Sequence, residues 1–281
     1  IREESVMSLV SLIGPRPNLF DLKNLATTKR LEVRQPILKN SDLQKIRDIC
    51  EIGDNQFFSR VLDVTFDKKI GPEGMKDCID KLCERAEKSV LAGENIIILS
   101  DRQFGPKRVP IPMLLATSAV HHHLIRKGLR TSVGLVVESA EPREVHHFAV
   151  LAGYGAEAIN PYLAFETLIQ MHQNGLFPKE VDEKELIKRY IKSIDKGLLK
   201  VMSKMGISTY QSYCGAQIFD AVGLSTKFID QYFSGTASKI EGVGIDQISK
   251  EAFIRHDMAY NNIPILRHSL DVGGEYAVRH R

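Results

Sequence analysis

The stretches NIIIL (Asn95 to Leu99) and VGLVVE (Val133 to Glu138) decide the fold class of this chain. Each is a short apolar run without a break, which is typical of a strand buried on both faces of a parallel sheet. Shorter strands are predicted on both sides of this pair, over residues 61–66 and 157–160. Apolar residues at helical spacing follow the strands, and they predict helices over residues 75–90, 112–127, 142–153 and 162–173.

This alternation of strand and helix predicts the architecture. Strand–loop–helix units that follow one another along a chain argue for a parallel sheet with right-handed crossovers. No glycine-rich turn follows the first strand, so a dinucleotide-binding sheet fits the pattern less well than a barrel. We therefore expect an α/β protein of parallel β/α units, similar to a (β/α)8 TIM barrel but degenerate or incomplete.

The flanking regions differ from this central pattern. Residues 1–40 contain two stretches punctuated by proline, GPRPNLFDL and QPIL, and they predict an extended N-terminal arm laid over the body. Residues 41–281 are expected to form one α/β barrel-like domain. In the second half, the pattern predicts a long helix from Asp182 to Met205, a fifth strand over 207–213, and short helices over 216–221, 226–233 and 245–260.

The composition is that of an ordinary globular protein, with 281 residues, 43% of them hydrophobic. A formal net charge of +3 does not indicate nucleic acid or an anionic membrane as a partner. The longest stretch of apolar or small residues, about Met113 to Val120, is far shorter than the roughly 20 residues of a membrane span. Four widely spread cysteines predict free thiols in a reducing compartment. Because the chain begins at Ile1 and ends at Arg281 with no closing element, we expect it to be one domain cut from a longer polypeptide.

Polar residues follow the predicted strands at the points where the strands end. In parallel α/β folds the chemistry takes place at this end of the sheet, so such a ring can hold a polar ligand or stabilise developing charge. The alternative, which we favour, is that each residue caps the following helix or lies in a turn. The residues are Asp67, Asp101 with Arg102, Glu138 with Ser139, and Asn160.

Two histidine clusters, His121–His123 and His146–His147, raise the question of a metal site. Adjacent residues of a helix point about 100° apart, so three in a row do not converge on one ion. Histidine ligands on a helix are usually spaced i, i+4. We therefore interpret both clusters as packed or hydrogen-bonded side chains. A metal-dependent hydrolase that uses both clusters is kept as an alternative.

Two weaker features have the chemistry to hold an anion. Gly242-Val243-Gly244 precedes a predicted helix, where backbone amides can cradle a phosphate, but a third glycine and a clear preceding strand are missing. Lys200 and Lys204 are four residues apart near the end of the long helix. We favour the interpretation that these lysines complement the negative end of the helix dipole.

Several long stretches resemble the central domain of the glutamate synthase large subunit. The arm stretches LIGPRPNLFDL and RQPIL and the final LDVGGEYAVR (Leu270 to Arg279) continue the resemblance, which covers nearly the whole chain. The main stretches are PIPMLLATSAVHHHLIRKGLRT (110–131), VVESAEPREVHHFAVLAGYGAEAINPYLAFETL (136–168), YIKSIDKGLLKVMSKMGISTYQSYCGAQIFDAVGL (190–224) and FSGTASKIEGVGIDQI (233–248).

The resemblance implies a role within a larger enzyme. Glutamate synthase makes two glutamates from glutamine, 2-oxoglutarate and a reductant. Its amidotransferase domain releases ammonia, and its FMN domain, which also holds an iron–sulfur cluster, uses that ammonia. The central domain is expected to connect these two domains of the same polypeptide and to help enclose the ammonia tunnel. It is expected to bind no cofactor and to have no activity alone, and no catalytic residue of the family can be transferred onto this chain.

A tunnel for a small neutral molecule needs walls of small residues with few fixed charges. Ser208, Thr209, Ser212 and Gly215 are the candidates for such a wall or for an interdomain surface. The expected location is the cytoplasm, or the plastid stroma if the source is a photosynthetic eukaryote. The alternative function is a stand-alone TIM-barrel-like enzyme that acts on a small polar or phosphorylated metabolite through the strand-end ring.

Overall fold

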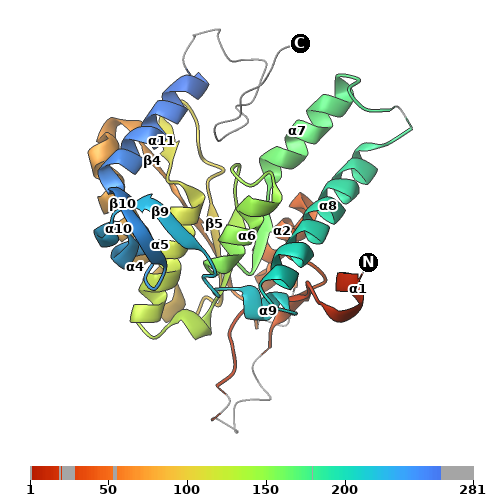
Figure 1. The fold of residues 1–281 in the computed structure, drawn as a ribbon, viewed down its shortest axis with the longest axis horizontal. Helices are drawn as coiled ribbons and strands as arrows, with labels where there is room; N and C mark the ends of the chain where they lie inside the picture. Colours follow the sequence, from red (N-terminus) through yellow and green to blue (C-terminus); the bar gives the residue numbers. More distant parts are fainter. Residues whose placement is uncertain (1, 19, 21–28, 53–55, 179, 261–281) are drawn as a thin grey trace.

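Four parallel strands form the central sheet, in the order β3-β5-β7-β8. Figure 1 labels β5 of this sheet, together with the helices around it. The computed structural model describes residues 2–18, 20, 29–52, 56–178 and 180–260, so the predicted match at Leu270 to Arg279 lies outside it. Each strand of the sheet is followed along the chain by a helix. The units are β3 (Ser59–Asp63) with α4 (Met75–Leu91), β5 (Ile96–Ser100) with α5 (Met113–Arg126), β7 (Gly134–Glu138) with α6 (Val145–Gly153), and β8 (Ala158–Asn160) with α7 (Tyr162–Gln173).

All the crossover helices cover one face of this sheet. Ile97, Leu99 and Val137 pack into the same apolar core as buried residues of α4, α5 and α6. The alternate side chains Ile96 and Ile98 point to the other face, against α2 (Asn40–Arg47) and β1 (Ser11–Ile13). Sequential strand order with helices on one side is the arrangement of a β/α barrel, and the prediction of parallel β/α units is confirmed. The barrel is incomplete, because the sheet of the described residues has four strands.

The N-terminal region covers the second face and one edge of the sheet. It contains α1 (Arg2–Val6) and an antiparallel pair, β1 with β2 (Leu31–Val33). Further along, the Ile159 amide donates to Pro36 O (2.8 Å) and the Leu38 amide donates to Ile159 O (2.8 Å). These bonds occupy the open edge of β8, whose backbone groups would otherwise lack partners.

The predicted strand over 61–66 is divided in two. β3 ends at Asp63, and β4 (Thr65–Asp67) pairs antiparallel with β6 (Arg108–Pro110) outside the central sheet. The physical reason is an Asx turn, in which an Asp63 carboxylate oxygen accepts from the backbone amide (2.8 Å) and the hydroxyl (2.7 Å) of Thr65. The turn redirects the chain after Asp63. Short 3-10 turns follow at Lys68–Ile70 and Pro72–Gly74, and another, Arg130–Ser132, precedes β7.

Some of the helices and strands predicted after Asp182 are confirmed, and others are wrong. α8 (Glu183–Lys204) begins after Asp182, whose side chain accepts from the Glu185 amide at 2.7 Å, so this predicted start is confirmed. The predicted strand over 207–213 is wrong, because Tyr210 and Tyr213 are both buried at helical spacing and form the short α9 (Tyr210–Tyr213). The predicted helix over 216–221 is also wrong. The remaining elements are β9 (Asp220–Leu224), α10 (Thr226–Tyr232), β10 (Ala237–Val243), α11 (Ile245–Tyr260) and, earlier in the chain, α3 (Ile49–Ile52).

The arm is packed closely against the sheet at Gly134. A Cβ atom at this position would lie 2.4 Å from the Gly14 backbone nitrogen and 2.8 Å from Glu157 Oε2. We predict that Gly134→Ala lowers the free energy of unfolding by about 1–3 kcal/mol, because the methyl group forces the arm away from the sheet. Urea unfolding measures the effect.

Gly105→Ala is the matched control, because a Cβ atom there meets nothing within 4 Å. It should change stability by no more than about 0.5 kcal/mol. Equal unfolding midpoints for the two variants would show that the arm is not closely packed at Gly134.

Candidate functional site

The strand-end ring is in part a connected network of buried side chains. A buried Asp101 carboxylate accepts from Ser139 Oγ (2.6 Å), from Tyr162 Oη (2.7 Å) and from the Ala140 amide (3.1 Å). Burial raises the pKa of Asp101, while the bonds from Ser139 and Tyr162 act in the opposite direction. Each of these bonds joins Asp101 to the loop after β7 or to the start of α7.

Glu138 is the second carboxylate of the ring and is 1% exposed. It accepts from Arg102 Nε (2.8 Å), and it also bonds to Arg47 and to the Ser100 hydroxyl. Arg102 stacks 4.1 Å over the Tyr162 ring. Both carboxylates are therefore engaged with protein partners, and the ring holds loops together.

The other two ring residues are placed differently. Asp67 lies in β4, outside the central sheet, and its carboxylate accepts from the Lys69 amide at 2.9 Å. Asn160 ends β8, and its amide nitrogen donates to Leu38 O and to Asn40 Oδ1, both at 2.9 Å. The capping interpretation is confirmed for Asp67, and the prediction that it shares one ring with Asp101 is wrong, because the Asx turn removes it from the sheet.

The histidines of α5 each have a different partner. His121 Nδ1 accepts a hydrogen bond from Arg130 Nε at 2.9 Å. His122 Nε2 lies 2.9 Å from Ser234 O, and His123 Nε2 lies 2.7 Å from Glu87 Oε2. His147 Nδ1 accepts from the Arg143 amide (3.2 Å), and the ring of His146 packs edge-on against Phe219. The interpretation of both clusters as packed or hydrogen-bonded side chains is confirmed.

The two weaker candidate anion sites, at Gly242–Gly244 and at Lys200 with Lys204, have other structural roles or are exposed. Gly242 and Val243 lie in β10, where a Cβ at Gly242 would lie 2.0 Å from Gly223 O, so this glycine permits close pairing with β9. The Gly244 amide donates to Gln247 Oε1 (3.2 Å) and is therefore occupied. Lys200 and Lys204 are exposed in the last turns of α8.

The four predicted wall residues lie around α9. Ser208 accepts at its carbonyl from the Ser8 amide (2.9 Å), and the Thr209 hydroxyl donates to Ser212 Oγ (2.9 Å). These three residues are exposed, whereas Gly215 is half-buried and donates its amide to Ala152 O at 3.0 Å. Gly215 has a left-handed backbone (φ 76°), which glycine adopts readily.

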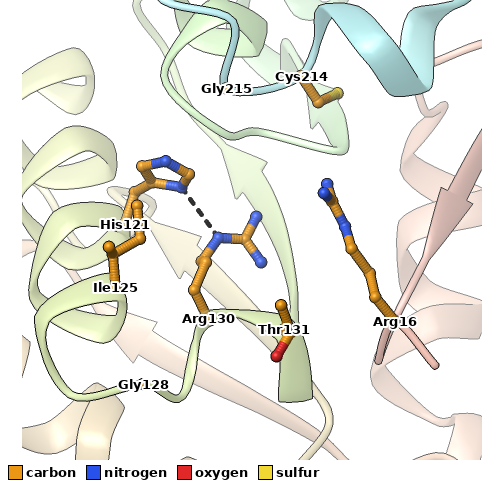
Figure 2. A pocket seen from close by; sticks show the side chains of 8 residues that line it. All are labelled: Arg16, His121, Ile125, Gly128, Arg130, Thr131, Cys214 and Gly215. Carbon is orange, nitrogen blue, oxygen red and sulfur yellow. Dashed lines mark hydrogen bonds between the residues drawn. The ribbon is translucent and has the colours of Figure 1, made fainter. Parts of the chain in front are cut away.

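Gly215 lines a cavity of about 350 Å³ that sequence reasoning did not identify (Figure 2). Four segments meet there: the arm, α5, the turn before β7, and the chain that leaves α9. The cavity therefore lies at the end of the sheet where β7 and β8 begin. Its lining residues are Arg16, His121, Ile125, Gly128, Arg130, Thr131, Cys214 and Gly215.

A buried ion pair underlies this cavity. Arg130 Nη2 lies 3.3 Å from Glu157 Oε1, and Glu157 is 0% exposed. The Arg130 guanidinium also donates to Val133 O (2.6 Å), to Gly155 O (3.0 Å) and to His121 Nδ1. Arg16 of the arm is 3.9 Å from the same Glu157 oxygen. Glu157 is the first residue of the strand predicted over 157–160, and a charged residue that is buried there requires a partner, but nothing in the sequence identifies Arg130 as that partner.

His121 is neutral in this setting. Burial, followed by the positive charge of Arg130, lowers the pKa of His121 to about 2. Because Nδ1 accepts from Arg130, the ring proton lies on Nε2. Burial likewise lowers the pKa of His122 to about 4.

These shifts predict acid sensitivity. Below about pH 6.5 the unfolded chain binds protons that the folded histidines do not bind, so stability present above that pH is lost as the pH falls towards the folded pKa values. His121 alone should remove about 1.4 kcal/mol per pH unit between pH 6 and pH 4. Urea unfolding at a series of pH values measures this slope.

His121→Gln should reduce that slope, because glutamine can accept from Arg130 but does not titrate. The same variant at pH 7.5 controls for any loss of packing, since there the histidine is neutral in both states. A variant with the wild-type slope would contradict the assignment of a strongly lowered pKa to His121.

Known proteins resemble this chain in sequence over most of its length. The family described as the glutamate synthase central domain matches residues 1–225. The NADPH glutamate synthase large chain of Bacillus subtilis is 45% identical over 93% of this chain and 16% of its own length. The NADH glutamate synthase of Saccharomyces cerevisiae is 41% identical over 99% of this chain and 13% of its own. A chloroplastic ferredoxin-dependent glutamate synthase of Arabidopsis thaliana is 40% identical over 89% of this chain and 16% of its own.

Among solved structures, flavocytochrome b2 with benzoylformate aligns with a TM-score of 0.39 and 11% identity, over 75% of this chain and 69% of that one. This chain spans less than a fifth of the length of the glutamate synthases named above. The match over residues 1–225 and the identities of 40–45% show that the chain belongs to the glutamate synthase central domain family.

Proposed function

We propose that this chain connects the amidotransferase and FMN domains of a glutamate synthase and helps to enclose the path of ammonia between them. The observation that carries the proposal is the family match, since the relatives are glutamate synthases that use NADH, NADPH or ferredoxin. The reaction of the whole polypeptide would convert glutamine, 2-oxoglutarate and reductant into two glutamates. FMN and an iron–sulfur cluster would be bound by other domains, and we assign no residue of this chain to either.

The connecting role is supported by an exposed apolar surface on β9 and β10. Val222 is 70% exposed and Ile240 is 58% exposed, and the two residues are paired across the parallel strands. Directly paired residues lie on the same face of a sheet. Parallel strands are normally covered on both faces. We propose that another domain of the same polypeptide covers this face, because the relatives are more than five times as long as this chain.

The passage is supported by the chemistry around α9. Ser208, Thr209 and Ser212 present small neutral hydroxyl side chains at the surface, and Gly215 opens onto the cavity beside neutral His121. The one buried carboxylate nearby, Glu157, is paired with Arg130. The fixed charges of the lining are the positive ones of Arg16 and Arg130, which would repel ammonium ions but not neutral ammonia.

The relatives also bear on location. No helix in the described part of the chain is long and apolar enough to cross a membrane. We propose a cytoplasmic location, or the plastid stroma in a photosynthetic eukaryote, and a chloroplastic relative supports the second case. The low number of cysteines and their free thiols agree with a reducing compartment.

Gly215→Leu tests the passage. A Cβ atom at Gly215 would lie 3.3 Å from His121 Cε1, so a leucine would extend into the cavity. In a full-length polypeptide that carries this chain, we expect glutamine hydrolysis and ammonia-dependent glutamate formation to continue. Their coupling should fall, so that ammonia appears in the medium in proportion to the glutamine hydrolysed.

Gly206→Leu is the matched control. Gly206 has a similar left-handed backbone (φ 71°), but a Cβ atom there meets nothing within 4 Å. This variant carries the same backbone strain without filling the cavity, and it should retain full coupling. Full coupling in Gly215→Leu would exclude Gly215 from the wall of the passage.

A further inference from the structure

We propose that the cavity beneath Cys214 and Gly215 binds a small dianion, either phosphate or a short dicarboxylate. This inference goes beyond the proposed function, since it concerns a charged solute other than ammonia, and it can be tested without any turnover. It rests on the charges, the free donors and the size of the cavity.

The charges around the cavity do not balance. Three guanidinium groups, those of Arg16, Arg30 and Arg130, act on the single buried carboxylate of Glu157. With His121 neutral, this group of side chains carries a formal surplus of two positive charges. The buried Arg130 is paired with Glu157, so the surplus lies on the partly exposed Arg16 and Arg30, where a dianion from solvent can compensate it.

Arg16 is positioned to meet such a ligand. The Arg16 backbone amide donates to Thr131 O at 2.7 Å, which holds the arm beside the turn that carries Arg130. Its side chain is 41% exposed, and within the described residues its guanidinium makes one ion-pair contact, at 3.9 Å from Glu157. Figure 2 shows the guanidinium groups of Arg16 and Arg130 turned into the same space. An arginine with free donors is suited to bind two oxygens of a carboxylate or phosphate at once.

A second donor comes from α5. His121 Nδ1 is occupied by Arg130, so the Nε2 proton lies on the Gly215 side of the ring, where it has no hydrogen-bond partner among the described residues. The donors therefore come from two separate segments, the arm and α5. The Gly215 amide is already bonded to Ala152 O and is not counted.

The size of the cavity also fits. Its volume of about 350 Å³ lies at the lower end of the roughly 300–1,000 Å³ that is usual for small-ligand sites. The lining combines the guanidinium groups of Arg16 and Arg130 with apolar surface that includes Ile125. The small volume and the two arginines therefore favour a small anion, whose carbon chain can contact the apolar part of the lining.

Isothermal titration calorimetry of the full 281-residue chain at low salt tests the proposal. The probes are inorganic phosphate, succinate and, as a monoanion control, acetate. We expect phosphate or succinate to bind at millimolar concentration or tighter, acetate to bind at least about tenfold more weakly, and affinity to fall as salt is added. Binding of one dianion but not the other would identify which of the two chemistries the site accepts.

Two arginine variants locate the site. Arg16→Gln should weaken binding at least about tenfold, because it removes the free donors and one of the surplus charges. Arg60→Gln is the matched control, since Arg60 is exposed and pairs with Glu94 outside the cavity, and it should bind within about twofold of wild type. Both side chains are partly exposed, so both variants should fold, which circular dichroism would verify.

Three results would overturn the proposal. They are no detectable binding of either dianion up to about 10 mM, acetate binding as tightly as the dianions, and equal affinity in Arg16→Gln and wild type. None of these outcomes depends on coupling between domains, so the proposed function could fail while the anion site stands, and the reverse.

Discussion

The buried pair of Arg130 and Glu157 is the interaction on which the surrounding structure depends. Arg130 binds the backbone at Val133 and Gly155, just before β7 and β8, and it orients the ring of His121. Glu157 accepts from the Gly14 amide at 3.2 Å, which ties the arm to the sheet. Loss of one member would leave an uncompensated charge in the interior, a change that typically costs about 3–5 kcal/mol. One pair thus joins the arm, two strands and α5, and it forms the floor of the cavity.

The two ends of the sheet have different characters. At the carboxyl ends of the strands, where β/α barrels usually carry their chemistry, Asp101 and Glu138 are bonded to protein groups and hold loops in place. The cavity lined by Gly215 lies at the opposite end, beside Arg130, and a second cavity of about 650 Å³ lies at the carboxyl ends, beside Ala140 and Glu141. In this fold the amino-terminal end of the sheet is usually associated with stability. Asp101 and Glu138 thus stabilise the loops of the β/α framework.

The sequence predicts the parts of the fold that depend on local pattern. Uninterrupted runs such as Asn95 to Leu99 predict β5 and β7, and Asp182 marks the start of α8, because apolar periodicity and helix caps are encoded over a few residues. The Asx turn at Asp63 and the helical spacing of Tyr210 and Tyr213 are local signals that compete with an apparent strand pattern. Contacts between distant residues are not encoded in this way.

The same limit applies to the site. The histidine cluster and Gly215 are visible in the sequence, but Arg130 bonds to His121 only after the chain turns back at Gly128, and Arg16 reaches the cavity only because the arm lies across the sheet. Hydrogen exchange, compared between this chain alone and the full-length polypeptide, tests the connecting role most directly. The account predicts that amides of residues 220–224 and 237–243 become protected in the full-length protein, where a neighbouring domain covers Val222 and Ile240. Equal exchange of these two strands in both proteins would contradict it.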